Sequence, residues 1–148
     1  MCDVNSPNVQ AFLKLIRYAE HYPDDSDDFY NTLYGGGRFT GYQSHPKQKV
    51  HRWGHTSDAA GAYQILGSVW QEQKDKGIVA DFSPAAQDKI AFGKFTYRHA
   101  LASVCAGDLA CAYVALKNEW TALPGARQSR MTGADGRAAF IRFGGTPK

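Results

Sequence analysis

The sequence changes pattern sharply between residues 23 and 56, where a segment without helical periodicity interrupts an otherwise helical chain. Before it, Ser6-Pro7 carries the N-cap and N1 signals of a helix start. Apolar residues then recur at helical spacing as far as Glu20. The interrupting segment is rich in glycine and aromatic residues, which favours loops with a short, irregular hairpin or small sheet, at about 34–42 and 50–55. We therefore expect an α+β fold, mostly helical, with one small β insertion after the first helix.

Helical patterns resume after the insertion. Starts are expected at Ala60, Ser83-Pro84, Asp108 and Asp135. The first of these helices should close at Gly77, and the helix capped by Asp108 should run to Trp120 before Pro124-Gly125. Neither an internal repeat nor an interdomain linker is evident. The 148 residues therefore predict a single domain over 1–148.

The composition excludes several classes of function. The chain holds 17 Lys and Arg against 14 Asp and Glu, a net charge of +3, without a dense basic run, so no nucleic-acid partner is expected. No apolar run approaches the roughly 20 residues that cross a bilayer, so no stable membrane association is expected. The first residues lack the basic and apolar regions of a signal peptide, which predicts synthesis in the cytoplasm.

The cysteines and histidines give no strong site. The three cysteines contain no CxxC pair. Cys105 and Cys111 flank a predicted turn, and two interpretations stay open for them: a disulfide, or two buried thiols. Cys2 is expected in a frayed terminal segment. The spacing of the remaining candidates, His45, His51 and His55, defines no metal site, so we expect neither a metal nor a cofactor.

Only three residues of this chain are Glu, which narrows the search for a general acid. Glu72 lies in a strongly polar stretch, and Glu119 sits beside Trp120 at the expected edge of a core. Glu20 differs from both, because it ends an apolar helix among His21 and two tyrosines. Partial burial there would raise the pKa of the Glu20 carboxyl and suit it to donate a proton near neutral pH.

The stretch Ser57 to Leu66 is a second candidate, because small residues open it and allow a substrate to approach the backbone. Ser57 and Gln64 would supply hydrogen bonds, and Tyr63 an aromatic face. Close packing of two helices through Ala and Gly explains the same pattern, and both interpretations stay open at this point.

A resemblance to a known family rests on this stretch. The pattern Ser57-x-Ala59-x-Gly61-x-x-Gln64 is similar to the motif of lysozyme-like lytic transglycosylases, and Ala60-Gly61-x-Tyr63-Gln64-Ile65-Leu66 looks like the lambda-type endolysins. Other short pieces match in the same order along the chain. They include Gly35-Gly36, Phe39-Thr40-x-Tyr42, His45-Pro46, Trp70, Asp81-Phe82-Ser83-Pro84-x-x-Gln87-Asp88 and Trp120-x-x-Leu123-Pro124-Gly125-Ala126.

The resemblance implies a lysozyme-like fold with a glycan cleft between two lobes. It implies cleavage of the β-1,4 bond between N-acetylmuramic acid and N-acetylglucosamine, with Glu20 as the catalytic acid. Ser57, Tyr63 and Gln64 would line the cleft or support Glu20, while Tyr34 and Tyr42 suit sugar stacking and His45 suits its rim. The partner would be the glycan strands of peptidoglycan. The enzyme, a monomer, would reach the host cell wall from the cytoplasm through a holin pore.

The residues leave the reaction open. Glycosidases usually need two carboxylates, and the run Asp24, Asp25, Asp27 and Asp28 offers candidates for the second, although such a run is more often a solvated loop. A lytic transglycosylase needs only Glu20, because the C6 hydroxyl of the sugar attacks in place of water. We expect this second route. A hydrolytic muramidase and a non-catalytic peptidoglycan-binding module are the alternatives.

Overall fold

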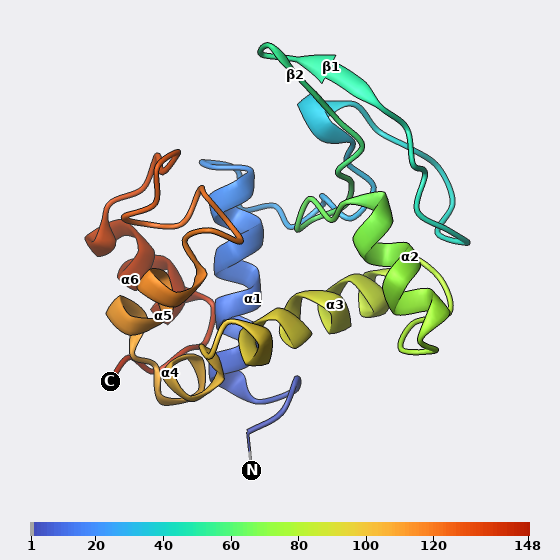
Figure 1. The fold of residues 1–148 in the computed structure, drawn as a ribbon. Helices are drawn as coiled ribbons and strands as arrows, with labels where there is room; N and C mark the ends of the chain where they lie inside the picture. The colour runs from blue at the N-terminus through green and yellow to red at the C-terminus, as the bar shows by residue number, and fades with distance from the viewer. Residues whose placement is uncertain (1) are drawn as a thin grey trace. The chain divides into compact units, whose positions relative to one another are not determined.

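A computed structural model describes residues 2–148. The helices are α1 (Pro7–Glu20), α2 (Gly67–Asp75), α3 (Pro84–Tyr97), α4 (Leu101–Ala106), α5 (Leu109–Leu116) and α6 (Gly133–Arg142). A 3-10 turn, η1 (Tyr34–Gly36), precedes the antiparallel strands β1 (Val50–Arg52) and β2 (His55–Ser57) (Figure 1). The prediction of a mostly helical chain with a small β insertion after the first helix is confirmed.

The chain forms two compact units. The first unit consists of the described residues up to Asp27 together with residues 91–148, and the second unit consists of residues 28–90. Helix α3 begins in the second unit and ends in the first.

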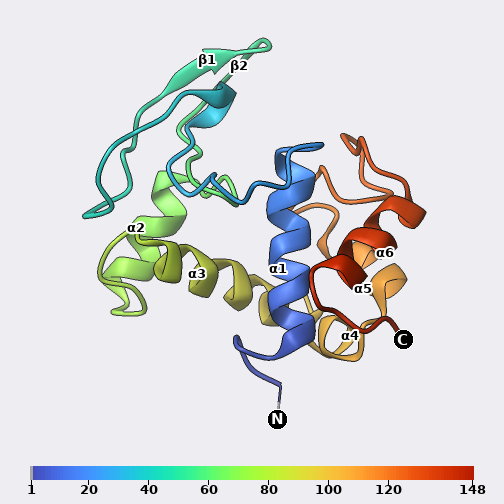
Figure 2. The ribbon, with the colours of Figure 1, turned by 180° about the vertical axis from the view of Figure 1, so that it is seen from behind.

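The first unit is built around α1, whose buried residues are all apolar except Arg17. Phe12 lies at its centre and makes ring contacts with Phe95 at 5.7 Å, Tyr113 at 6.1 Å and Phe140 at 6.5 Å. Helices α4, α5 and α6 gather beside α1 in both views (Figures 1 and 2). Since Phe12 and its apolar neighbours on α1 are completely buried, this core holds the helix that ends in Glu20.

The second unit has its own small aromatic core. Phe82 packs on Phe39 at 6.0 Å, on Trp70 at 6.3 Å and on the His45 ring at 4.8 Å between ring centres. The Trp70 indole N–H donates to the Asp81 carbonyl at 2.8 Å, so its polar edge is satisfied inside the core. These contacts anchor the insertion that carries η1 and the β1–β2 hairpin.

Three local starts follow the sequence signals. Pro7 and Pro84 open α1 and α3, and Asp108 caps α5 by accepting a hydrogen bond from the Cys111 backbone N–H at 3.2 Å. Helix α6 starts slightly earlier than expected, because Thr132 and Asp135 form a reciprocal capping box. These starts depend on neighbouring residues only, which is why the sequence predicts them well.

Other boundaries differ from the predictions. Residues 61–64 form a turn that a bridge between Ala60 and Ile65 closes. Helix α2 starts only at Gly67, because Gly61 (φ +84°) and Gln64 (φ +52°) have left-handed backbones that a helix excludes. Helix α5 ends at Leu116 instead of Trp120. At residues 34–42, η1 and a single bridge between Thr32 and Arg38 replace a hairpin strand.

The cysteine interpretation is corrected by the structure. Cys2 is bonded to Cys105, a separation of 103 residues, and Cys111 is an exposed free thiol. The N-terminal segment is therefore tied to α4, and the pairing of Cys105 with Cys111 does not occur.

Candidate active site

Glu20 is the last residue of α1 and lies partly buried at the end of that apolar helix. Burial raises the pKa of its carboxyl from the ordinary 4.5 to about 7, and the positive charge of Arg130 opposes this rise. The raised pKa expected from the sequence is thereby confirmed, whereas the contribution of Arg130, from the loop before α6, was not foreseen. A carboxyl with this pKa is protonated in a large fraction of molecules at neutral pH, as a general acid requires.

The turn that follows Glu20 is held by an ion pair. Arg17, one helical turn before Glu20, donates from Nε to Asp27 Oδ1 at 2.5 Å and from a terminal nitrogen to Oδ2 at 3.0 Å. The Arg17 side chain is only 8% exposed. The His21 backbone N–H also donates back to the Arg17 carbonyl at 3.2 Å. The bidentate pair thus fastens the segment after Glu20 to the helix that carries it.

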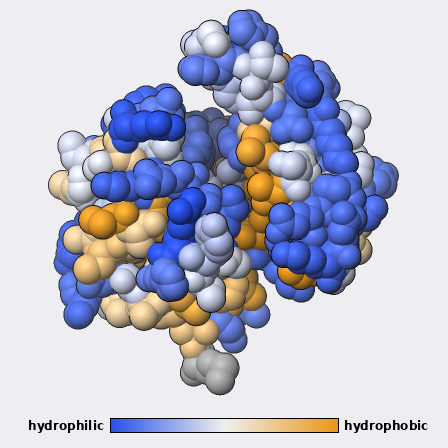
Figure 3. Space-filling model, viewed as in Figure 1, coloured by the Kyte–Doolittle hydropathy of each residue, from blue (hydrophilic) through white to orange (hydrophobic). Residues whose placement is uncertain are grey.

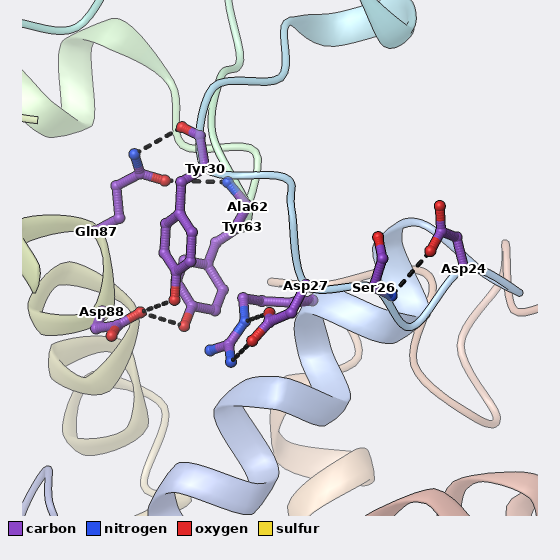
Figure 4. A network of polar contacts seen from close by, with 9 residues as sticks. Asp24, Ser26, Asp27, Tyr30, Ala62, Tyr63, Gln87 and Asp88 are labelled. Atoms are coloured by element: carbon purple, nitrogen blue, oxygen red, sulfur yellow. Dashed lines mark hydrogen bonds and ion pairs between the residues drawn. The ribbon is translucent and has the colours of Figure 1, made fainter. Parts of the chain in front are cut away.

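The other aspartates of the run have partners of their own. Asp24 accepts from the Ser26 backbone N–H at 2.8 Å, which closes a tight turn (Figure 4). Asp25 faces Arg142 at 3.4 Å, and Asp28 lies 3.7 Å from Arg38. The run is therefore an exposed, partly ion-paired turn segment.

The remaining glutamates are engaged in ion pairs. Glu119 contacts Lys94 at 3.0 Å and Arg98 at 3.1 Å, and its side chain is 14% exposed. Burial acts to raise the pKa of Glu119, but the hydrogen bonds and charges of Lys94 and Arg98 outweigh it and leave the pKa below its usual value. Glu72 pairs with Lys76 on the exposed face of α2. The pKa is therefore raised for Glu20 and lowered for Glu119.

The motif residues 57–64 form a compact turn in the second unit. Ser57, at the end of β2, accepts a hydrogen bond from the Ala59 backbone N–H at 3.1 Å. Gln64 donates from its side chain to the Gly61 carbonyl at 2.9 Å. Both side chains are partly exposed, so each retains surface for a ligand. The helix–helix packing interpretation does not apply, because this stretch is not helical.

Tyr63 is 2% exposed, and its hydroxyl donates to Asp88 Oδ1 at 2.6 Å. The Tyr30 hydroxyl donates to the same oxygen at 2.8 Å, and the two tyrosine rings meet edge to face at 6.3 Å. Figure 4 shows both phenols directed at Asp88, on α3. Our sequence reasoning did not single out Tyr30 or Asp88 as site residues. The position of Asp88 one helical turn after Ser83-Pro84 was the available signal, since it places the carboxylate on the first turns of a helix.

Gln87, next to Asp88, is completely buried and organises the same region. Its oxygen accepts from the Ala62 backbone N–H at 3.0 Å, and its nitrogen donates to the Tyr30 carbonyl at 2.9 Å (Figure 4). The same nitrogen donates to the Phe82 carbonyl at 3.0 Å. A side chain at Gly61 would collide with the Gln87 oxygen, since its Cβ would lie 2.2 Å away. The glycine of the motif is therefore required by the close approach of Gln87.

The remaining predicted site residues, Tyr34, Tyr42 and His45, differ in how far their side chains are exposed. Tyr34, in η1, is partly exposed, and its hydroxyl donates to the Arg52 carbonyl at 3.1 Å. Tyr42 is partly exposed and packs edge to face on Phe39 at 6.1 Å. His45 is 2% exposed, with Nε2 2.7 Å from the Ile65 carbonyl and Nδ1 accepting from a backbone N–H. Burial lowers the pKa of His45.

Among residues 2–148, no group of three or more His, Cys, Asp or Glu side chains is arranged to hold a metal ion. Within the same residues, every helix is too short or too polar to span a bilayer.

The amino-acid sequence is similar to those of known proteins. Residues 10–146 match the family described as Endolysin. The chain is 31% identical over 131 residues to the endolysin of Escherichia phage lambda, covering 85% of this chain and 82% of that protein. It is 32% identical over 133 residues to the endolysin of Escherichia phage P2, covering 80% of this chain and 81% of that protein.

Solved structures agree with the sequence comparison. Bacteriophage lambda lysozyme complexed with a chitohexasaccharide superposes with a TM-score of 0.87 at 29% identity, over 100% of both chains. A second structure of lysozyme from bacteriophage lambda gives a TM-score of 0.83 at 26% identity, again over 100% of both chains. The lysozyme-like fold is thereby confirmed. Because the family match spans most of the sequence and two endolysins align over most of its length, the chain belongs to the endolysin family.

Proposed function

We propose that this endolysin is a lytic transglycosylase that cleaves the β-1,4 bond between N-acetylmuramic acid and N-acetylglucosamine in peptidoglycan. Membership of the family makes the chain a cell-wall-degrading enzyme of the lambda type. The observation that carries the proposal is the pKa of about 7 for the Glu20 carboxyl at the end of α1. A single carboxyl with that pKa can donate a proton and later accept one at neutral pH.

In the proposed reaction, Glu20 first protonates the glycosidic oxygen as the bond from C1 of the muramic acid breaks. The C6 hydroxyl of the same sugar then attacks C1, and the Glu20 carboxylate takes the hydroxyl proton. Glu20 ends the cycle protonated, no water is consumed, and the product is a 1,6-anhydro sugar. The nucleophile is intramolecular, so its entropy cost is low.

The contacts of the aspartate run support this route over one that uses a second carboxylate. Asp27 is held in a bidentate pair with Arg17, and Asp24 closes its own turn. A carboxylate that acts as nucleophile or base must be available to the sugar or to a water. Asp27 would have to leave a largely buried arginine to serve in this way, which costs far more than breaking an exposed pair.

We assign substrate contact to Ser57, Gln64, Tyr34 and Tyr42, whose side chains are partly exposed. Tyr63 is proposed to act through Asp88, because its hydroxyl is occupied by that carboxylate. His45 is proposed to position the turn at Ile65 and not to touch the sugar, since the ring is buried and both nitrogens have backbone partners.

The experiment that tests the proposal is mass analysis of the fragments released from purified peptidoglycan. We expect muropeptides that end in 1,6-anhydromuramic acid and are one water lighter than lysozyme products. Fragments with reducing ends would refute the transglycosylase route and establish the alternative, a hydrolytic muramidase. The solved lambda protein is described as a lysozyme, which is the term for a hydrolytic enzyme of this kind. Binding without release of fragments would establish a non-catalytic binding module instead.

The cellular course of the reaction is part of the same proposal. We infer synthesis in the host cytoplasm, passage through a holin pore and action as a monomer on the wall. Co-expression with and without a membrane pore should give lysis only with the pore. Size-exclusion chromatography should give one peak at the mass of a single chain.

A further inference from the structure

The tip of the β1–β2 hairpin carries an aromatic side chain in an unfavourable backbone position. Trp53 and Gly54 are its two central residues, with φ of +53° and +75°. Positive φ at both positions is the geometry of a type I′ turn, for which Asn-Gly is the preferred pair. A bulky residue in the left-handed region is an outlier of the kind found at functional sites. The Trp53 side chain is 68% exposed, so burial of the indole does not explain its presence.

The surroundings of Trp53 hold it in one orientation. The Arg52 guanidinium lies 5.0 Å from the centre of the indole ring, and the Tyr34 ring meets it edge to face at 5.6 Å. Arg52 donates to the Gly35 carbonyl at 2.8 Å, and its own carbonyl accepts from the Tyr34 hydroxyl at 3.1 Å. Figure 2 shows η1 next to the hairpin. The exposed indole therefore packs against the Arg52 guanidinium and the Tyr34 ring.

The hairpin lies in a long segment of the chain that contains basic residues and no acidic ones. Residues 29–57 contain four Lys and Arg, three His and no Asp or Glu. Among residues 2–148, no carboxylate lies within ion-pair distance of Lys47, Lys49 or Arg52. Lys47 instead donates to the Gln71 side chain. The positive charge of this surface is consequently not neutralised within the protein.

From these observations we propose that the hairpin tip, Lys49 to His55, binds the carboxylates of the peptide stems of peptidoglycan. The proposal rests on the proposed function and adds a second recognised part of the same substrate. The amino sugars of the glycan backbone carry no net charge once the muramic acid is joined to a peptide, whereas the stems carry free carboxylates. Lys49 and Arg52 would pair with those carboxylates, and Trp53 would pack on the peptide backbone beside them.

A membrane surface fits the tip less well. Binding to a bilayer interface scales with the apolar area that enters it. Trp53 is the only large hydrophobic side chain exposed on the described hairpin, whose other exposed residues include His51, Arg52 and His55. In Figure 3 the hairpin end of the second unit is drawn almost entirely in blue and white. The tip offers charge and one ring, which suits a polar anionic polymer.

The test uses substitutions that preserve the turn. Trp53→Asn removes the ring and installs the residue preferred at this turn position, so loss of folding cannot account for the result. Lys49→Gln removes an exposed charge. Tyr97→Asn is the matched control for the ring, because Tyr97 is 72% exposed on α3 and lies under Arg98 at 5.2 Å. Lys89→Gln, at an exposed position of α3, is the control for the charge.

Each variant is made in a Glu20→Gln background and mixed with two insoluble substrates. One is intact peptidoglycan, and the other is chitin, an uncharged polymer of β-1,4-linked N-acetylglucosamine that carries no peptides. We expect the Trp53→Asn, Lys49→Gln double variant to bind intact peptidoglycan about tenfold more weakly at low salt. Binding to chitin should be unchanged, and both control variants should bind each substrate normally.

Three outcomes would overturn the proposal. An equal loss on both substrates would show that the tip contacts sugar, and no loss on either would show that it contacts neither part. Vesicles that contain phosphatidylglycerol serve as a third ligand, and retention there that depends on Trp53, with unchanged peptidoglycan binding, would assign the tip to a membrane. Fragment release by the Glu20→Gln background would refute the catalytic assignment separately, because it appears in the supernatant and not in the bound fraction.

Discussion

Replacing Glu20 with Gln should make the protein inactive and, at neutral and alkaline pH, more stable. Gln has nearly the shape of a protonated glutamic acid but cannot ionise. Above pH 7 the wild-type carboxyl must hold a negative charge in a site that opposes it. The variant avoids that charge and keeps the packing of the end of α1. The expected gain in stability therefore comes from the group that performs the chemistry.

The size of the effect follows from the two pKa values. The carboxyl titrates at 4.5 in the unfolded chain and at about 7 in the folded protein. Between these values the folded state binds more protons, so the free energy of unfolding of the wild type falls as pH rises. At about 1.4 kcal/mol per pH unit, the loss is complete above pH 7 and amounts to about 3 kcal/mol. For a protein of this size the midpoint of thermal unfolding should differ by about 6–12 °C.

The assay is thermal unfolding of both proteins, followed by circular dichroism between pH 4 and pH 9. At pH 4 the two midpoints should coincide, because the carboxyl is protonated in both states. At pH 8 the Glu20→Gln midpoint should be the higher one. Lysis of peptidoglycan should be lost at every pH.

Glu72→Gln is the matched control, since Glu72 is an exposed residue paired with Lys76. Its free energy of unfolding should stay within about 0.5 kcal/mol of the wild-type value. A Glu20→Gln protein no more stable than the wild type at pH 8 would mean that Glu20 is well solvated, and the acid role would lose its physical basis.

Three further outcomes are expected. Arg130→Gln should move the alkaline limb of the activity–pH profile to higher pH, because Arg130 lowers the pKa of Glu20; a limb that stays in place would exclude that influence. Cys2→Ser opens a disulfide of separation 103 and should lower the free energy of unfolding by up to about 5 kcal/mol under oxidising conditions, measured by urea titration, with no difference from the wild type when both are reduced. Gly61→Ala should unfold at lower urea concentration, by about 1–3 kcal/mol, because of its φ of +84° and its contact with Gln87; unchanged stability would show that Gln87 can move away.

Glu20 illustrates how much of the site can be predicted from the sequence. Its position at the end of an apolar helix predicted partial burial and a raised pKa, and both follow from residues within one helix. Arg130 and Asp27 could not be placed this way, since Arg130 is far along the chain and Asp27 lies in a turn whose path depends on the Arg17 contact. Asp88 was missed for the same reason, because its significance comes from two tyrosine hydroxyls that meet it from distant segments.

The amino-acid sequence by itself determined the starts of α1, α3 and α5, the mostly helical class, the β insertion and the candidate acid. These features depend on caps, prolines and apolar spacing, which act between residues a few positions apart. Only the tertiary structure decided that residues 60–66 are not helical and that Cys2 bonds to Cys105. In the first case a buried Gln87 holds the turn open, and in the second a bond joins the two ends of a long loop. Such contacts join residues that are far apart in the sequence. They override the local preference for a helix or a turn, and the pattern of neighbouring residues does not predict them.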